Sequence, residues 1–509
     1  ATGGLISGVL SFCAGGLRVV ADSASYWFKA GNAIFQIPMG YSLALLGAGY
    51  MVGLAGGIAI LLGIVIAWGV LVPYFSATLP QPADVDVATF ALTLWKEKVR
   101  FIGAGTLGVA AVWTLIMLLK PMAEGMRLSL AAMRAPQDYQ RSRVEQDLSP
   151  KAMIGWTLGM LVMLGLSFHH FVDSAAISDT AGWILVLLGT LLSFFIGFLV
   201  AAACGYMAGL VGSSSSPISG VGIVSVVIVS LVLLVYGESA GLFAHEGNRQ
   251  FMLALTLFVG SAVVSVASVS NDNLQDLKTG WLIQATPWRQ QVALIIGCVV
   301  GALVIAPVLE MLYQAYGFTG AMPREGMDVK QALAAPQATL MTTIATGIFS
   351  HNLQWNYIFT GIGIGVALII VDRLLRSRPG TNLSLPVLAV GMGIYLPPAV
   401  NMPIVIGTVL ATLVRKRIQR RHADRKEAEP YLKRAERTGT LMAAGLIVGE
   451  SLMGVIMAFI IAFSVTSGGS DAPLALSLEN WDDAASWLGL AAFVVGAALL
   501  VGRVMKAAR

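Results

Sequence analysis

A single carboxylate stands inside an apolar stretch near the end of the chain. Glu450 is the one acidic residue in 438–465, and small residues, Gly449 and Ser451, flank it. A charged side chain at the centre of a membrane helix costs about 2.5–3.5 kcal/mol on insertion scales, so such groups usually serve proton or ion pathways. We predict that Glu450 is a proton-linked carboxyl. The alternative is a protonated glutamate that is hydrogen-bonded to a neighbouring helix.

The densest run of hydrogen-bonding groups is the decapeptide NDNLQDLKTG at 271–280, which follows a long apolar segment. Its carboxylates, amides and lysine have the chemistry to hold the amine and carboxylate of a peptide or to relay a proton. The alternative is an interfacial loop in which Asn and Asp cap helices and the lysine snorkels. The candidate substrate- or proton-pathway residues here are Asn271, Asp272, Asn273, Gln275, Asp276 and Lys278.

A third polar group lies beside 336–350, a stretch apolar enough for a re-entrant helix. His351, Asn352 and Gln354 combine an imidazole with two amides. An interfacial aromatic belt explains the neighbouring Trp355 but not the amides. We therefore treat these three residues as candidates that line a site.

Ser213 and Ser214 raise an enzymatic alternative, an intramembrane serine protease, which needs a histidine base within hydrogen-bond reach. The stretch lacks a glycine after the candidate serine, and no histidine is evidently paired with it. The sequence also contains no HExxH zinc motif and no GxxxxGK[ST] phosphate-binding loop. A channel would need a ring of identical residues from several subunits, which scattered, unique polar sites do not suggest. We expect no enzyme, no cofactor and no metal site, and keep both serines as pathway candidates.

The composition indicates whether this chain is suited to water or to lipid. Of 509 residues 57% are apolar and 12% are charged, against about 25% charged in a soluble domain. So little polar surface cannot cover a globule in water, and the 56 glycines suit close helix approach in lipid. The net charge of +5 does not indicate a nucleic-acid partner.

The fold class expected is an all-α polytopic membrane protein with roughly 13–14 transmembrane helices, since crossing the hydrocarbon takes about 20 apolar residues. Such segments lie at 3–20, 38–55, 57–75, 101–120, 152–171, 181–206, 218–236, 250–270, 290–309, 353–373, 438–465 and 484–506.

One further apolar stretch, 384–414, is interrupted by LPP at 396–398 and by NMP at 401–403. Proline removes a backbone donor and clashes with the preceding turn. We predict two short helices whose ends meet inside the protein, with Tyr395 and Asn401 facing a central cavity.

Basic residues gather at 121–151, 373–378, 415–437 and 503–509. Counting spans puts all four on one side if 384–414 goes out and back, and the positive-inside rule makes that side the cytoplasm. We expect 121–151 and the basic stretch 415–437 to be cytoplasmic loops. No polar stretch is long enough for a soluble domain, so 1–509 reads as a single multi-pass domain of the inner (cytoplasmic) membrane.

Four groups of motifs, in order along most of the chain, carry a resemblance to a known family. They are GLVGSS at 209–214 with SPISG at 216–220, NLQDLKTG at 273–280 with ATPWRQ at 285–290, GMGIYLP at 391–397, and AGLIVGESL at 444–452. Together they resemble the oligopeptide transporter (OPT) family in a bacterial-type member.

The resemblance implies a repeat-based core with broken helices, further helices upstream of Ala1, and proton-coupled import of small peptides. In the yellow-stripe-like branch it implies import of metal chelates instead, with the metal entering only as part of the substrate. The partners expected are a small peptide or metal chelate and the lipid bilayer. A homo-oligomer through lipid-facing helices is left open.

Overall fold

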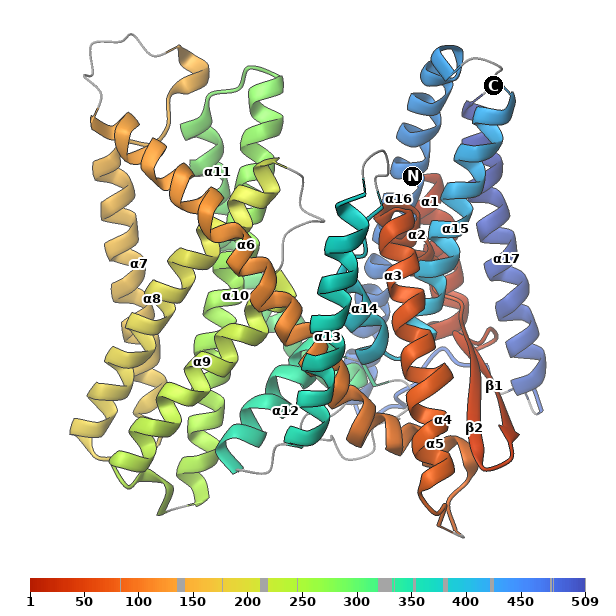
Figure 1. The fold of residues 1–509 in the computed structure, drawn as a ribbon, viewed down its shortest axis with the longest axis horizontal. Coiled ribbons are helices and arrows are strands. Elements are labelled where there is room, and N and C mark those ends of the chain that lie inside the picture. The colour runs from red at the N-terminus through yellow and green to blue at the C-terminus, as the bar shows by residue number, and fades with distance from the viewer. Residues whose placement is uncertain are drawn as a thin grey trace. The chain divides into compact units, whose positions relative to one another are not determined.

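The structure, a computed structural model, describes residues 1–509 except 83, 135–141, 176, 211–217, 245, 319–331, 334, 351–353, 379–382, 422–424, 477, 479 and 509. Within the described part, ten helices are long and apolar enough to cross a membrane, and shorter apolar helices cover Thr2–Gly16 and Leu43–Val52. This confirms an all-α polytopic membrane protein (Figure 1). The predicted spans 3–20 and 38–55 correspond to these two short helices. The first ends at Gly16, before the hairpin at 23–40, and the second ends at Val52, before Gly53 with its φ of +83°.

Two compact units make up the chain. Unit 1 comprises Ala1–Leu107, Val308–Ala334 and Trp355–Arg509, and unit 2 comprises Gly108–Pro307 and Ala335–Gln354. Two long helices have residues in both units, α6 (Arg100–Arg134) and α11 (Pro287–Tyr316).

Unit 2 is built around the helix pair α8 and α10, its most extensive helix contact. Ser270 of α10 donates to the carbonyl of Ala201 on α8 at 2.6 Å, and Phe168, Leu233 and Met252 form part of a fully buried core. The elements that lie wholly in unit 2 are α7 (Pro150–Val172), α8 (Asp179–Leu210), α9 (Ile218–Ser239), α10 (Glu246–Leu282), α12 (Pro336–Ser350) and the short 3-10 turns η4 (Arg143–Glu145) and η6 (Leu242–Ala244).

Unit 1 contains a two-stranded sheet, several short helices and three π-helical turns. Its elements are α1 (Thr2–Ser11), η1 (Phe12–Gly16), β1 (Ser23–Ala30), β2 (Ala33–Gly40), α2 (Leu43–Val52), α3 (Leu54–Ile64), η2 (Val65–Leu71), α4 (Val72–Thr78), α5 (Val87–Leu94), η3 (Trp95–Val99), α13 (Trp355–Arg376), α14 (Val387–Tyr395), α15 (Pro398–Arg421), α16 (Arg425–Thr466) and α17 (Asp482–Ala507). Asp86 caps α5, and hydrogen bonds from Thr89 and Ala88 hold the pKa of this loop carboxyl below its ordinary value.

The hairpin β1–β2 is absent from the sequence-based prediction, which had placed 38–40 in a membrane span. Its two strands pair antiparallel, with Ala30 opposite Ala33. Gly31, at φ +63°, is the first residue of the two-residue turn, as tight hairpins with glycine at this position require. The backbone N–H of Ile34 donates to Ser76 of α4 at 2.9 Å, which fastens β2 to the helix beside it (Figure 1).

Helices of unit 1 approach one another through glycines. Gly4 and Gly8 of α1 face Gly445 and Gly449 of α16, each pair four residues apart, as in the small-xxx-small packing of membrane helices. A Cβ added to Gly449 would lie 2.1 Å from the carbonyl oxygen of Gly4. The backbones of α1 and α16 therefore pack directly against each other, which is possible because glycine has no side chain.

The interrupted stretch 384–414 forms two helices, as predicted, but only LPP breaks the helix and the second helix is not short. Helix α14 ends at Tyr395, α15 begins at Pro398, and Pro403 lies inside the continuous helix α15. Pro403 has no N–H to donate to the carbonyl of Ala399, yet that carbonyl is covered, since a Cβ on Gly40 of β2 would lie 2.0 Å from it. Protein cover of a freed carbonyl is what allows proline inside a membrane helix.

The two stretches expected as loops are largely helical in the described residues. Helix α6 continues to Arg134, so the first part of 121–151 is helix. The stretch 415–437 is divided between the end of α15 at Arg421 and the start of α16 at Arg425. The charged residues there extend the membrane helices because Lys, Arg and Glu are good helix formers.

Candidate functional site

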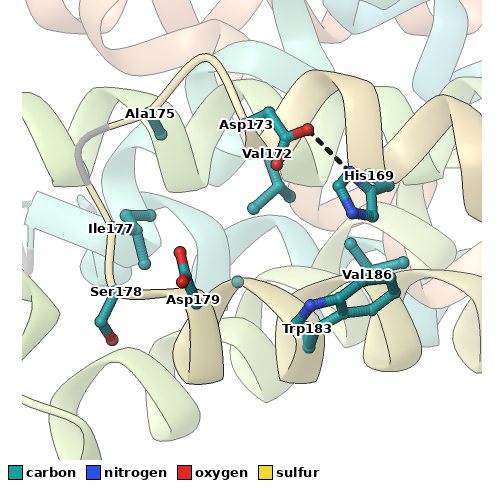
Figure 2. A pocket seen from close by; sticks show the side chains of 10 residues that line it. His169, Val172, Asp173, Ala175, Ile177, Ser178, Asp179, Trp183 and Val186 are labelled. Atoms are coloured by element: carbon teal, nitrogen blue, oxygen red, sulfur yellow. Dashed lines mark ion pairs between the residues drawn. The ribbon is translucent and has the colours of Figure 1, made fainter.

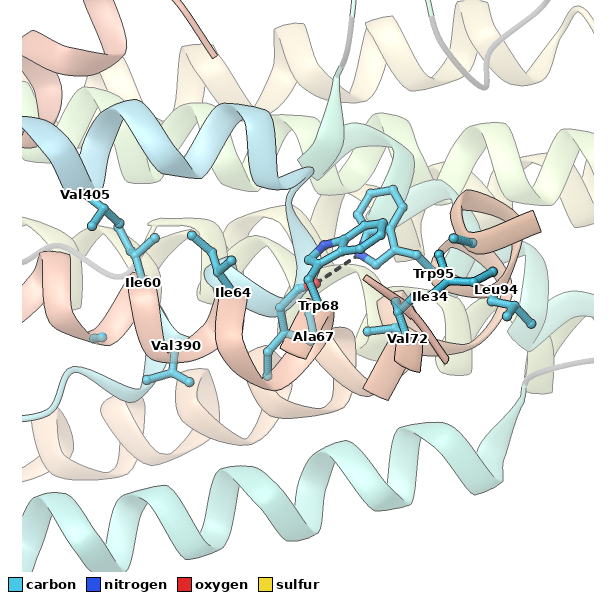
Figure 3. Close-up of a cluster of buried hydrophobic side chains, with 14 of the residues drawn as sticks. Ile34, Ile60, Ile64, Ala67, Trp68, Val72, Leu94, Trp95, Val390 and Val405 are labelled. Carbon is cyan, nitrogen blue, oxygen red and sulfur yellow. Dashed lines mark hydrogen bonds between the residues drawn. The ribbon is translucent and has the colours of Figure 1, made fainter. Parts of the chain in front are cut away.

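Three departures from regular α-helix meet at one place in unit 1. They are the π-turn η2, the π-turn η3 and the break after α14. Trp68 of η2 and Trp95 of η3 pack with ring centroids 6.0 Å apart, and Trp95 reaches the backbone just before the break (Figure 3). π-Turns are costly and occur often at functional sites, so this junction is our candidate site.

The break leaves two carbonyls without their helical donors. In a continuous helix, the carbonyls of Gly393 and Ile394 would accept from residues 397 and 398, and both of those are proline. The indole N–H of Trp95 donates to the Ile394 carbonyl at 3.3 Å, and Nδ2 of Asn401 donates to the Gly393 carbonyl at 3.3 Å. Side chains from two other elements thus replace the hydrogen bonds that the proline pair removes.

Asn401 is completely buried, and its amide nitrogen also lies 3.4 Å from the carbonyl oxygen of Leu396. Its role in the structure is to close the end of α14 from the first turn of α15. Within the described part of the chain its Oδ1 has no hydrogen-bond partner. The amide nitrogen is occupied by backbone carbonyls, so only Oδ1 could bind a substrate. The predicted role of Asn401 in facing a cavity is therefore limited to this oxygen.

Arg100 and Tyr395 form the charged part of the site. At the end of η3 the backbone N–H of Arg100 donates to the carbonyl of Trp95, five residues back. This register puts the guanidinium carbon 5.2 Å from the Trp95 ring centroid and 4.6 Å from that of Tyr395, and one of its N–H groups donates to the Tyr395 hydroxyl. Tyr395 is buried, so the predicted residue is at the site and holds a cation there.

A second cation, Lys98, lies on the same π-turn. Its ammonium donates to the hydroxyl of Tyr357 at 2.9 Å and lies 4.9 Å from that ring and 5.9 Å from the Phe75 ring. Both cations are partly buried. Among the residues with described positions, no carboxylate forms an ion pair with Lys98 or Arg100.

The sequence-based reasoning missed these two cations although a signal was present. Lys96, Lys98 and Arg100 precede the apolar part of α6, whereas Arg127 and Arg134 follow it. If the Arg127 end is cytoplasmic, three cations at the other end run against the positive-inside rule. The exposed Lys96 can extend into water at the interface, but the partly buried Lys98 and Arg100 need a specific reason, such as a ligand.

Glu450 of α16 accepts three hydrogen bonds from two other helices. Its Oε1 accepts from the Ser42 hydroxyl at 2.6 Å, and its Oε2 accepts from the backbone N–H of Ala44 at 3.0 Å and the Ser7 hydroxyl at 3.4 Å. The carboxyl therefore caps the N-terminus of α2, where backbone N–H groups and the helix dipole favour a negative charge. The contacts with neighbouring helices agree with the alternative reading of Glu450, but all three are donated to the carboxyl and none requires the protonated form which that reading assumed. The small neighbour Gly449 makes room for helix α1.

The decapeptide forms the C-terminal part of α10, so the alternative of an interfacial loop is wrong. Helical periodicity continues because Leu274 and Leu277 keep the apolar face, and Leu274 packs against Gly205 of α8. Asn271 is 6% exposed, Asn273 and Gln275 are partly buried, and the charged Asp272, Asp276 and Lys278 are exposed. The ammonium of Lys278 lies 4.8 Å from the ring centroid of Trp281.

Alanine at Asp276 or Lys278 should leave folding nearly unchanged, because each side chain is exposed and no described ion pair holds it. Surface substitutions of this kind usually change stability by less than about 0.5 kcal/mol. We expect wild-type thermal unfolding together with reduced substrate uptake if the decapeptide serves transport. Failure of both variants to fold would make the decapeptide a structural clasp, and wild-type uptake would remove it from the pathway.

The remaining predicted residues are only partly covered by the structure. Gln354 is exposed immediately before α13. His351, Asn352, Ser213 and Ser214 lie outside the described residues.

Unit 2 contains a pocket of about 350 Å³ at the turn between α7 and α8 (Figure 2). In it His169 Nδ1 lies 2.8 Å from Asp173, and the imidazole meets the Trp183 ring edge-on at 4.4 Å. Asp179 lines the same pocket. Because both partners of the ion pair belong to the end of α7, its simplest role is to stabilise the last turn of that helix as an i,i+4 pair.

Comparisons with known proteins point to one family. A family model described as OPT oligopeptide transporter protein matches residues 1–461. A Haemophilus influenzae protein named "Putative oligopeptide transporter" is 55% identical over 507 residues, which cover 100% of this chain and 79% of that protein.

More distant relatives come from plants. A protein of Oryza sativa subsp. japonica named "Probable metal-nicotianamine transporter YSL14" is 23% identical over 439 residues, 81% of this chain and 54% of that protein. The "Metal-nicotianamine transporter YSL2" of Arabidopsis thaliana is 26% identical over 227 residues, 43% of this chain and 30% of that protein. The chain thus spans about half, or less, of these plant relatives.

Proposed function

Since the chain belongs to the OPT oligopeptide transporter family, we propose that it is a proton-coupled secondary transporter that takes up small oligopeptides across the cytoplasmic membrane. The relative that is 55% identical over the whole chain carries a peptide-transporter name, which favours a peptide substrate. Uptake of metal chelates is the second candidate, because the plant relatives are named for metal–nicotianamine transport.

The observation that carries the proposal is the broken helix α14–α15. Transporters place substrate where discontinuous helices end, since unwound backbone and half-helix ends supply ligands there. In unit 1 Trp95 and Asn401 supply the hydrogen bonds missing at this break, and Arg100, which lacks a described carboxylate partner, lies beside it on Tyr395. A site of this kind combines a preformed backbone irregularity with uncompensated charge.

For the coupling carboxyl we propose Glu450. All three of its contacts are donated to it, and the N–H of Ala44 cannot reverse its direction. A proton added to the carboxyl removes the negative charge that strengthens these contacts and makes the protonated oxygen a weaker acceptor. Protonation would loosen the hold of α16 on α1 and α2, so the proton would change the packing of three helices in unit 1.

The protein reconstituted in proteoliposomes should accumulate small peptides when the outside is made acidic, and a protonophore should abolish that accumulation. The measurement compares radiolabelled di- and tripeptides with the iron–nicotianamine complex in the same vesicles. Accumulation of the iron complex but not of peptides would replace the first candidate by the second. Accumulation of neither would make the proposed function wrong.

A further inference from the structure

The guanidinium of Arg100 has far more hydrogen-bonding capacity than its contacts use. It carries five N–H donors, and among the described residues it forms one hydrogen bond, to the Tyr395 hydroxyl. Its two ring contacts with Trp95 and Tyr395 engage the positive charge and consume no N–H donor. Its Nε is buried and has no hydrogen-bond partner among the described residues.

Unpartnered donors gather around the same ring. Trp68, 3% exposed, packs on Trp95, and within the part of the chain that the structure describes its indole N–H also has no partner. Buried donors without acceptors are rare and ask for an explanation, such as a ligand that supplies the acceptor. At this junction the missing partner is an acceptor, and the uncompensated charge is positive.

A second cation lies two residues before Arg100, with its own aromatic contacts and next to the exposed Glu97. Lys98 on the same π-turn is held by Tyr357, and it too lacks a carboxylate partner among the described side chains. The aromatic contacts hold both cations in place before any ligand arrives, so the entropy of ordering them is spent in folding and not in binding. Fixed cations in a site of low dielectric attract anions strongly.

From these observations we propose that Arg100 binds a carboxylate of the transported substrate, and this rests on the proposed transport function. The planar guanidinium matches a carboxylate with two parallel N–H···O bonds. Lys98 adds to the positive potential, and Tyr395 orients the guanidinium. The carboxylate is either the C-terminus of a peptide or a carboxylate of a metal chelate.

The test compares trialanine with trialanine amide, which differs at the C-terminal carboxylate alone. In proteoliposomes the wild type should prefer trialanine, with a kcat/KM about 10- to 100-fold above that of the amide, as expected for a charge-assisted pair. Arg100→Gln should bring this ratio close to one, chiefly through the KM of trialanine. If the substrate is instead a chelate, the wild type takes up iron–nicotianamine and not trialanine, and Arg100→Gln raises the KM of that complex by about the same factor.

Lys96→Gln is the matched control, because it removes a positive charge from the same turn at an exposed position. It should keep the wild-type ratio. Thermal unfolding in detergent checks that Arg100→Gln folds, and Arg100→Lys, which keeps the charge but not the fork, should show an intermediate ratio. A wild-type ratio in Arg100→Gln, or in Arg100→Lys should the first variant not fold, overturns the carboxylate site. A wild type that moves neither peptide nor chelate overturns the proposed function instead.

Discussion

Replacing Gly407 with alanine should destabilise unit 1 strongly although it adds one methyl group. A Cβ at this position of α15 would lie 2.1 Å from the carbonyl oxygen of Leu46 and 2.8 Å from the backbone nitrogen of Tyr50 on α2. Backbone atoms cannot move aside as a flexible side chain would, so the two helices must separate. We expect a loss at or above the upper end of the range of about 1–3 kcal/mol seen for overpacking, measured as a lowered Tm in detergent and reduced yield.

Gly363→Ala supplies the matched control for this substitution. Gly363 lies in α13 of the same unit, and a Cβ there would meet nothing within 4 Å. Alanine in a helix is favoured over glycine by about 0.8–1.0 kcal/mol, so this variant should match or exceed the wild-type Tm. Equal losses in both variants would contradict the close packing of α2 and α15.

Substitution of Glu450 should separate its structural role from its proposed coupling role. Glu450→Ala leaves the Ser42 and Ser7 hydroxyls and the Ala44 N–H without their acceptor, which should cost about 3 kcal/mol, since each orphaned donor costs about 1–3 kcal/mol when buried. Glu450→Gln keeps the size and one acceptor but cannot exchange a proton. We expect it to fold, to bind substrate and to carry out counterflow, yet to lose accumulation driven by a pH gradient.

Ser42→Ala distinguishes these two effects. It removes the shortest contact of the carboxyl, at 2.6 Å, but no titratable group. Ser42 is also the N-cap of α2, where its hydroxyl accepts from the backbone N–H of Leu45 at 3.1 Å. The variant should lower the Tm, since loss of an N-cap costs about 0.5–2 kcal/mol, and it should retain gradient-driven accumulation. If Glu450→Gln still concentrates substrate against its gradient, the coupling carboxyl lies elsewhere, with Asp276 as the next residue to test.

Most of the helices were predictable from the sequence because hydropathy is a local property. A helix in lipid satisfies its own backbone hydrogen bonds, so an apolar run of sufficient length is enough to predict a span. The hairpin at 23–40 was also written locally, in a two-residue Gly-Asn turn between strands rich in aromatic and β-branched residues. It is not visible as a run of about 20 apolar residues, because each strand has only eight residues.

The polar residues show where local reasoning ends. The cost of a carboxylate in an apolar helix singled out Glu450, and Pro397 and Pro398 predicted a break. Neither observation identifies the groups that contact Glu450 or the broken helix. The donors to Glu450 come from residues 406 to 443 positions away, and Trp95 lies 299 positions from the carbonyl that it repairs.

By itself, then, the sequence determined the solvent of this protein, most of its spans, the one break in α14–α15 and the family to which it belongs. The tertiary structure alone decided which side chains meet at that break, because such contacts depend on helix packing and not on spacing along the chain. Arg100 illustrates this. In the sequence it is a cation at the end of a span, as an interfacial anchor would be. Only its position over Trp95 and Tyr395, without a described carboxylate beside it, makes it a candidate substrate-binding residue.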